Sequence, residues 1–185
     1  MATKVKHLMT VADLDAIPYD EWHRFELIEG ELYVSCAPGI PHQLVLHKIQ
    51  LRLGIYLEQN PIGTLVPGPG AVFSDYDSVI PDIVYVSKDR WGGIVEDDRF
   101  YAAPDLVIEI LSPGSQNRSR DLKLKHRVYG KYGVQEYWVV DCLGRSVTIF
   151  RLEGKVLEEI VTLGENDVLE SPLFPELSLK LSAIF

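Results

Sequence analysis

Two acidic residues in apolar surroundings are the most informative feature of the sequence. Asp82 follows a proline at the start of an apolar run, and Glu109 lies inside another, Leu-Val-Ile-Glu-Ile-Leu at 106–111. A carboxylate in a buried strand is costly unless it is paired or binds a metal. Mg²⁺ is commonly held by one or two carboxylates plus water and phosphate oxygens. The pair indicates a metal site; the alternatives are an ion pair for Glu109 and a turn role for Asp82.

A lysine further along the chain could complete a site that acts on phosphate esters. A metal held by two carboxylates can activate a water and stabilise the charge that develops on a phosphate. Lys125 would orient that water or neutralise the phosphate. Asp121 lies four residues before it, on the same face of a helix, so the two could equally form a salt bridge. The residues alone leave both roles open.

The chain is acidic overall but gathers positive charge in one segment. Its formal net charge of −9 argues against a nonspecific nucleic-acid coat, because such proteins gain affinity from a basic surface. Six of its 18 Lys and Arg residues lie between positions 118 and 131: Arg118, Arg120, Lys123, Lys125, Arg127 and Lys131. This run is typical of a solvated helix face, and it would also suit one wall of a nucleic-acid groove.

Composition predicts one globular domain of 185 residues, with residues 1–24 as a helical lead-in. Hydrophobic residues make up 46%, and no stretch approaches the ~20 apolar residues of a membrane helix. The N-terminus lacks the apolar core of a signal peptide, so we expect a cytoplasmic protein. Cys36 and Cys142 have no zinc-ligand spacing and are expected to be reduced thiols.

Hydrophobic periodicity predicts a mixed α/β (α+β) fold with a central sheet. A capping box at Thr10 begins a short helix, and a hairpin turns at Glu29-Gly30. Apolar residues at helical spacing predict a helix over 42–58, and the basic segment predicts another that ends at Gly133. Strands are expected at 64–66, 71–74, 79–86, 106–111, 137–140 and 147–152, with 87–100 as a polar surface excursion.

Four linked segments occur in a characteristic order. They are Pro-Asp-Ile-Val-Tyr-Val-Ser at 81–87, Pro-Asp-Leu-Val-Ile-Glu-Ile-Leu-Ser-Pro at 104–113, Asp121…Lys125…Tyr129, and Gly-Val-Gln-Glu-Tyr-Trp-Val-Val-Asp at 133–141. Together they resemble the Uma family of restriction endonucleases, which belongs to the PD-(D/E)XK nuclease superfamily. The likeness extends from the hairpin at 29–32 to at least Asp141.

The resemblance implies a restriction-endonuclease-like fold: a four-stranded mixed sheet flanked by helices, with an N-terminal hairpin. It also implies Mg²⁺ or Mn²⁺ as cofactor and DNA as substrate. Asp82 and Glu109 would be catalytic metal ligands. The superfamily's usual lysine position is Leu111 here, so Lys125 would take its place from the following helix.

Further roles follow from the same resemblance. His42, Glu31 and Asp121 would support the site, while Arg118, Arg120 and Lys123 would contact DNA. Nucleases of this type often pair to cut both strands, so a homodimer is expected.

Two other functions fit the same residues. Leu111 and the acidic surface favour a binding or interaction module with weak or no activity, since a fold does not guarantee an activity. The second alternative function is a hydrolase that acts on another phosphate ester. No Gly-x-Ser-x-Gly elbow or Walker motif is present, which argues against a serine hydrolase and a nucleoside-triphosphate site. Tyr129 and Trp138 are expected to be core residues.

Overall fold

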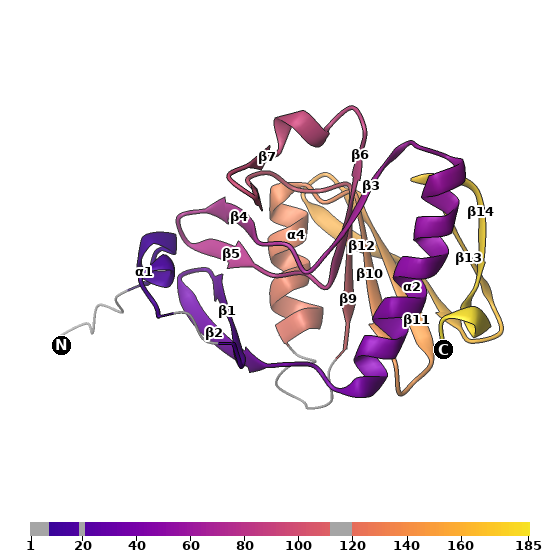
Figure 1. Cartoon of the computed structure of the whole chain (residues 1–185), viewed down its shortest axis with the longest axis horizontal. Coiled ribbons are helices and arrows are strands. Elements are labelled where there is room, and N and C mark those ends of the chain that lie inside the picture. The colour runs from indigo at the N-terminus through magenta and orange to yellow at the C-terminus, as the bar shows by residue number, and fades with distance from the viewer. Residues whose placement is uncertain (1–7, 19–20, 112–119) are drawn as a thin grey trace.

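The computed structural model describes residues 8–18, 21–111 and 120–185, and the side chains of 120–122 are not included. Its strands form two six-stranded sheets and a C-terminal hairpin (Figure 1). The main sheet has the order β12-β11-β10-β9-β6-β3. Its strands are β3 (Gly63–Pro67), β6 (Ile83–Ser87), β9 (Leu106–Ile110), β10 (Glu136–Asp141), β11 (Ser146–Glu153) and β12 (Val156–Gly164).

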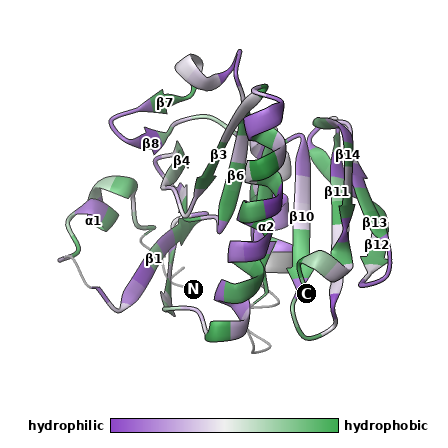
Figure 2. Ribbon diagram, turned by 45° about the vertical axis from the view of Figure 1, so that its right-hand side comes forward, coloured by the Kyte–Doolittle hydropathy of each residue, from purple (hydrophilic) through white to green (hydrophobic). Residues whose placement is uncertain are grey.

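The main sheet is mixed, as predicted: β9 and β10 are parallel, and every other neighbouring pair is antiparallel. The central strands β6, β9 and β10 are buried on both faces, which explains their continuous apolar sequences. Figure 2 shows β6 as almost wholly hydrophobic. The sheet has six strands where the resemblance implied four, because β11 and β12 continue it beyond β10 as an antiparallel meander.

Alternation along the central strands divides the core in two. One face packs against α2 (Ile40–Gln59), the longest helix, through its buried residues Val45, Ile49 and Leu53. The opposite face packs against α4 (His126–Tyr132), which follows directly on a π-helical segment, Arg120–Lys125. The helices predicted over 42–58 and in the basic segment are therefore present. Residues that point toward α4 include Val84 on β6 and Val107 on β9.

The second sheet lies on the same side as α4 and contributes to its core. Its order is β2-β1-β5-β4-β8-β7. The strands are β1 (His23–Ile28), β2 (Glu31–Cys36), β4 (Ala71–Ser74), β5 (Asp77–Val79), β7 (Val95–Glu96) and β8 (Arg99–Phe100), preceded by the capped helix α1 (Val11–Asp15). The prediction that 87–100 is only a surface excursion was wrong. Phe100 is buried and β8 pairs with β4, so this segment completes a sheet.

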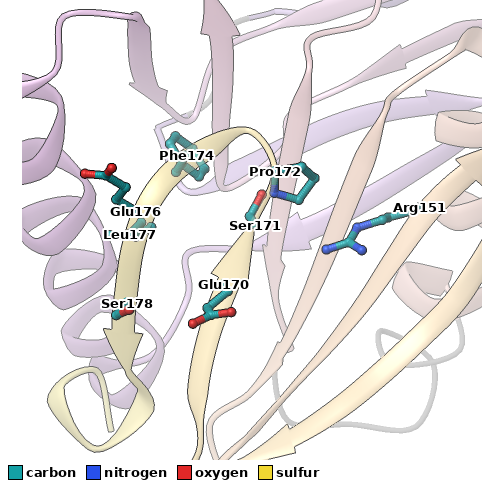
Figure 3. Close-up of a pocket in the computed structure, with 8 residues that line it drawn as sticks. All are labelled: Arg151, Glu170, Ser171, Pro172, Phe174, Glu176, Leu177 and Ser178. Atoms are coloured by element: carbon teal, nitrogen blue, oxygen red, sulfur yellow. The ribbon is translucent and has the colours of Figure 1, made fainter.

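The C-terminal hairpin of β13 (Val168–Ser171) and β14 (Phe174–Lys180) packs beside the main sheet. A hollow of about 410 Å³ lies under it (Figure 3). At its wall Ser171 donates a hydrogen bond to the buried carboxylate of Glu136, which also accepts one from Arg151 at 2.8 Å. This network joins the hairpin to β10 and β11. Within the described ranges, no helix is both long and apolar enough to cross a membrane.

Asp77 is a buried carboxylate that joins the second sheet to α4. It accepts hydrogen bonds from the backbone N–H of Glu29 (2.8 Å), the Tyr132 hydroxyl (2.7 Å) and the Lys131 ammonium (3.2 Å). Burial disfavours its charge, but these bonds outweigh that effect and lower the pKa of Asp77 below its ordinary value. The charged carboxylate therefore stabilises the fold.

Replacing Asp77 by asparagine is expected to lower the free energy of unfolding at pH 7 by about 1–3 kcal/mol, because the amide has one acceptor oxygen in place of two and no charge to offer its three donors. The contribution of a group with a lowered folded pKa is present above its unfolded pKa and disappears as pH falls through the folded pKa. The difference from wild type should therefore shrink below about pH 4. Urea unfolding at pH 7 and pH 3 measures both effects. The exposed neighbour Asp75→Asn is the control, and an equal loss in both variants would contradict the prediction.

Candidate active site

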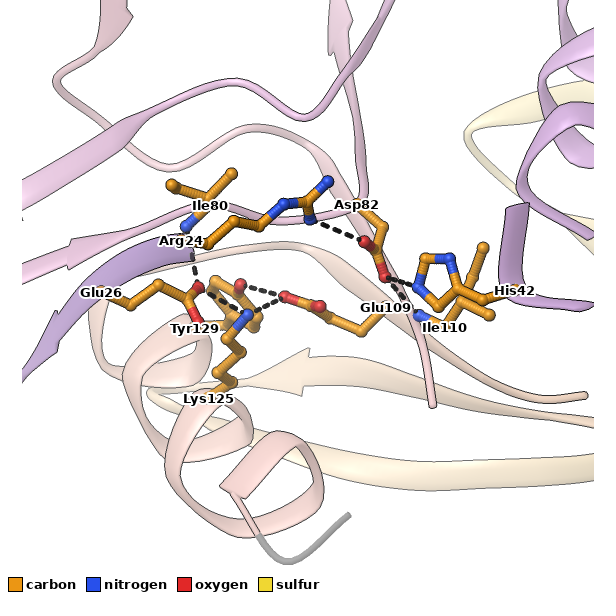
Figure 4. Close-up of polar contacts among 9 residues, drawn as sticks. All are labelled: Arg24, Glu26, His42, Ile80, Asp82, Glu109, Ile110, Lys125 and Tyr129. Atoms are coloured by element: carbon orange, nitrogen blue, oxygen red, sulfur yellow. Dashed lines mark hydrogen bonds and ion pairs between the residues drawn. The ribbon is translucent and has the colours of Figure 1, made fainter. Parts of the chain in front are cut away.

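Asp82 and Glu109 lie side by side on neighbouring strands. β6 and β9 are antiparallel with Ile83 opposite Ile108, so Asp82, the residue before β6, comes opposite Glu109. Residues directly opposite in an antiparallel pair point to the same face, with Cβ atoms about 4.5–5.5 Å apart. Both side chains are buried, at 5% and 3% exposure. Glu109 lies on the face of β9 that carries Val107, while Asp82, just before β6, contacts both Arg24 of the second sheet and His42 of α2. Figure 4 shows the two carboxyl groups at the centre of one polar group.

Asp82 is held by two hydrogen bonds to one oxygen. Its Oδ2 lies 3.0 Å from Nε2 of His42, near the N-terminus of α2, and accepts the backbone N–H of Ile110 at 2.8 Å. Its Oδ1 lies 3.4 Å from the guanidinium of Arg24. Burial raises the pKa of Asp82, but the bonds from His42 and Ile110 and the charge of Lys125 outweigh it and bring the pKa below its usual value. Asp82 is therefore an ionised carboxylate in a fixed orientation.

Lys125 lies between two glutamates. Its ammonium is 2.8 Å from Oε1 of Glu109 and 2.7 Å from Oε1 of Glu26 on β1, and its side chain is only 2% exposed. Glu26 also accepts the backbone N–H of Ile80 at 2.9 Å. The Tyr129 hydroxyl donates to Oε1 of Glu109 at 2.6 Å. Burial, and then the charge of Glu109, raises the pKa of Tyr129 well above its ordinary value, so this hydroxyl stays protonated as a donor.

The helical segment after β9 places Lys125 and Tyr129 on the same face. They are four residues apart, and side chains at this spacing are neighbours along a helix. Val128 and Tyr129 are buried in the core between α4 and the main sheet, which fixes this face toward Glu109. Gly133 ends α4 in the left-handed conformation, with φ 95°, as its predicted role as a C-cap requires.

Four of the predicted site residues come together: Asp82, Glu109, Lys125 and His42. His42 contacts Asp82 directly, so in this structure it orients a carboxylate and does not face an open phosphate position. Its Nδ1 is buried and has no hydrogen-bond partner among the described residues. Glu31 is instead exposed at the start of β2, where it accepts a hydrogen bond from the Tyr33 hydroxyl, outside the buried polar group.

The remaining predicted residues belong to the basic segment. Lys123 is exposed, as a residue in contact with a large polymer would need to be. Arg118 lies outside the described residues, as do the side chains of Arg120 and Asp121. The structure therefore gives no geometry for the expected contacts of these three.

Three members of the polar group were not predicted: Glu26, Arg24 and the hydroxyl of Tyr129. Glu26 lies in an apolar run, Phe-Glu-Leu-Ile, just as Glu109 does, so the argument from a buried charge applied to it equally. Arg24 precedes it by two residues and thus shares its face of β1. Tyr129 is a core residue as expected, and its hydroxyl gives it a second role.

The donor set suits a hard divalent cation. The described part of the chain holds no cluster of three or more His, Cys, Asp or Glu side chains that could bind a metal. Mg²⁺ does not need one, because it usually binds one or two carboxylates and completes its shell with water and phosphate oxygens. Three carboxylates, of Asp82, Glu109 and Glu26, share this site with the ammonium of Lys125 and the guanidinium of Arg24. A further cation therefore fits its charge.

Comparisons with known proteins show the fold and the family of the chain. A crystal structure titled as "a putative nuclease belonging to DUF820 from Anabaena variabilis ATCC 29413" is 23% identical and matches with a TM-score of 0.76, over 96% of this chain and 97% of that chain. At this identity the likeness shows a shared fold, which confirms the predicted fold class. No curated protein matches the chain. The model of one family, Uma2, described as "Putative restriction endonuclease", matches residues 11–182. The chain therefore belongs to the Uma2 family.

Proposed function

We propose that this protein is a metal-dependent endonuclease that hydrolyses DNA phosphodiester bonds. The observation that carries the proposal is the placement of Asp82 and Glu109 side by side, with the Lys125 ammonium 2.8 Å from Glu109. Two carboxylates can hold a metal that activates water, and a lysine beside them can stabilise charge on a phosphate, which together suit metal-assisted phosphodiester cleavage. Membership of the Uma2 family supports a nuclease of this kind.

Asp82 and Glu109 would hold Mg²⁺ or Mn²⁺, which supplies an activated water and neutralises charge on the phosphate. The chain's own residues orient these ligands. His42 and the N–H of Ile110 fix one oxygen of Asp82, while Tyr129 and Lys125 fix one oxygen of Glu109. Such supporting contacts hold ligands in the geometry that the metal needs.

Lys125 would stabilise the negative charge that develops on the phosphate in the transition state. Its two carboxylate partners hold the ammonium in place. Exposed Lys123 on the same segment, together with Arg118 and Arg120, would contact the DNA backbone, which is where proteins gain most nonspecific affinity. A homodimer would bring two such sites to the two strands of a duplex.

The burial of Lys125 also favours a second candidate, a nuclease-fold binding module without catalysis. A lysine that is 2% exposed and paired twice has the environment of a structural ion pair. The two candidates differ in one property, because only the nuclease would break DNA when the metal is present.

Titration of Mg²⁺ and Mn²⁺ into the wild-type protein, with supercoiled plasmid followed on the same samples, separates them. The nuclease is expected to bind the metal and to convert plasmid to nicked and linear forms. Chelation by EDTA should stop conversion, and restored metal should restart it. An absence of both metal binding and conversion would favour the binding module instead.

A further inference from the structure

The second sheet opens into a cleft next to the buried polar group. β1 and β5 pair at one described position, Leu27 opposite Ser78. Beyond it, the N–H of Ile80 bonds to the side chain of Glu26 in place of a strand partner. The two strands diverge there, and the space between them is a cleft of about 510 Å³. This cleft begins where the buried polar group ends, because Arg24 and Ile80 belong to both.

The cleft wall is mainly apolar. Its lining includes Leu14 and Ile17, from α1 and the residues after it, and Phe25 on β1. Ser78 provides a hydroxyl, and Gly70 leaves room because it has no side chain. Apolar walls with a few hydrogen-bonding groups suit a small ligand such as a nucleobase, and the volume lies in the usual range of about 300–1,000 Å³ for small-molecule pockets.

The two arginines of the cleft differ in how completely acidic side chains already pair with them. Arg99 makes two hydrogen bonds to Asp15, at 2.9 and 3.2 Å, so its charge is largely compensated. The only hydrogen bond described for Arg24 is the long one to Asp82, at 3.4 Å. A guanidinium has five N–H donors, and the side chain of Arg24 is 35% exposed. Arg24 can therefore bind an anion at the boundary between the cleft and the carboxylates.

We propose that this cleft binds the base of an unpaired nucleotide next to the scissile phosphate, while Arg24 holds a phosphate of that nucleotide. The proposal rests on the nuclease function proposed above and adds a substrate class to it. A base inside a duplex is stacked on both faces and cannot enter such a cleft. The substrate is therefore single-stranded DNA, or a duplex in which one nucleotide has turned out of the stack.

Binding of a mononucleotide in EDTA tests the cleft without any cleavage. Calorimetric titration of wild type with 2′-deoxyadenosine 5′-monophosphate and with inorganic phosphate should show that the nucleotide binds about tenfold tighter, because a stacked base adds affinity of that order. Arg24→Met should weaken the binding of both. Equal affinity of wild type for the two compounds would overturn the proposal.

Filling the cleft provides the matched comparison. A Cβ at Gly70 would lie 3.6 Å from the Arg99 side chain, an ordinary contact, so Gly70→Leu should fold and occupy the space. It should lose the preference for the nucleotide and keep its affinity for phosphate. Gly54→Leu on α2, where nothing lies within 4 Å, is the control and should keep the preference. A preference that persists in Gly70→Leu, shown to be folded by thermal melting, would overturn the cleft assignment.

A second variant covers the case in which Gly70→Leu does not fold. Phe25→Ala removes part of the apolar wall and should also reduce the preference for the nucleotide. Because the titrations contain EDTA, their outcome does not depend on nuclease activity. Plasmid cleavage without nucleotide preference would overturn the cleft alone, whereas nucleotide preference without cleavage would overturn the nuclease proposal and leave the nucleotide site.

Discussion

Glu109→Gln is expected to abolish Mg²⁺ binding and to slow plasmid cleavage by about 10³-fold. The reason is that a metal supplies several kcal/mol of transition-state stabilisation and each tenfold in rate corresponds to about 1.4 kcal/mol. Glutamine keeps the size of the side chain and can still accept hydrogen bonds from Tyr129 and Lys125. The variant should therefore remain folded while it loses an anionic ligand. Calorimetry with Mg²⁺ and plasmid cleavage on the same samples measure the two effects.

Glu136→Gln is the matched control for this experiment. Glu136 is also a buried glutamate on a central strand, but it lies opposite Leu106 at the other end of β9 and pairs with Arg151 and Ser171. Its replacement should lower stability without changing metal affinity or cleavage. If Glu109→Gln cleaved plasmid at the wild-type rate, or if both variants lost activity equally, Glu109 would not be a metal ligand of the enzyme.

Local pattern predicted most of the elements and little of their pairing. Strand β9 and helix α2 could be read from sequence because burial on both faces leaves a continuous apolar run and burial on one face leaves a helical period. The pairing of β4 with β8 joins residues almost 30 positions apart through a single described contact, Ala71 opposite Phe100. No local pattern specifies such a contact. The second sheet therefore became visible only in the structure.

The site shows the same division. Glu109 is predicted from sequence because a charge interrupts an apolar strand. Lys125 is a candidate because it lies on a basic helix near the two carboxylates, and the family resemblance strengthens its catalytic role and adds His42. Glu26 is also a charge inside an apolar run. It belongs, however, to a short hairpin with two further glutamates, Glu29 and Glu31, and the sequence does not show which of the three is buried. Which glutamate is buried depends on which face of each strand points into the core: Glu26 is buried against Lys125, while Glu31 is exposed. The face of the hairpin that becomes buried is the one that packs against α4, which is far away in the sequence.

Lys125→Met is expected to reduce both stability and activity, and a second substitution should separate the two effects. Without the ammonium, Glu26 and Glu109 would lie close together in a buried site, and breaking a buried ion pair in this way costs about 3–5 kcal/mol. Adding Glu26→Gln removes one of the two charges. The double variant should therefore recover about 1–3 kcal/mol of the free energy of unfolding, the usual coupling between residues in contact.

Cleavage should not recover with stability. If Lys125 stabilises charge on the phosphate, both the single and the double variant should cleave plasmid about 10²–10³-fold more slowly than wild type, the usual cost of losing one such group. Urea unfolding and cleavage rates on the same preparations measure the two properties. Lys131→Met is the control, since this half-exposed lysine on the same helix should contribute about 1 kcal/mol or less and nothing to cleavage. A double variant that regained both stability and full activity would show that the lysine serves only to neutralise its two glutamates.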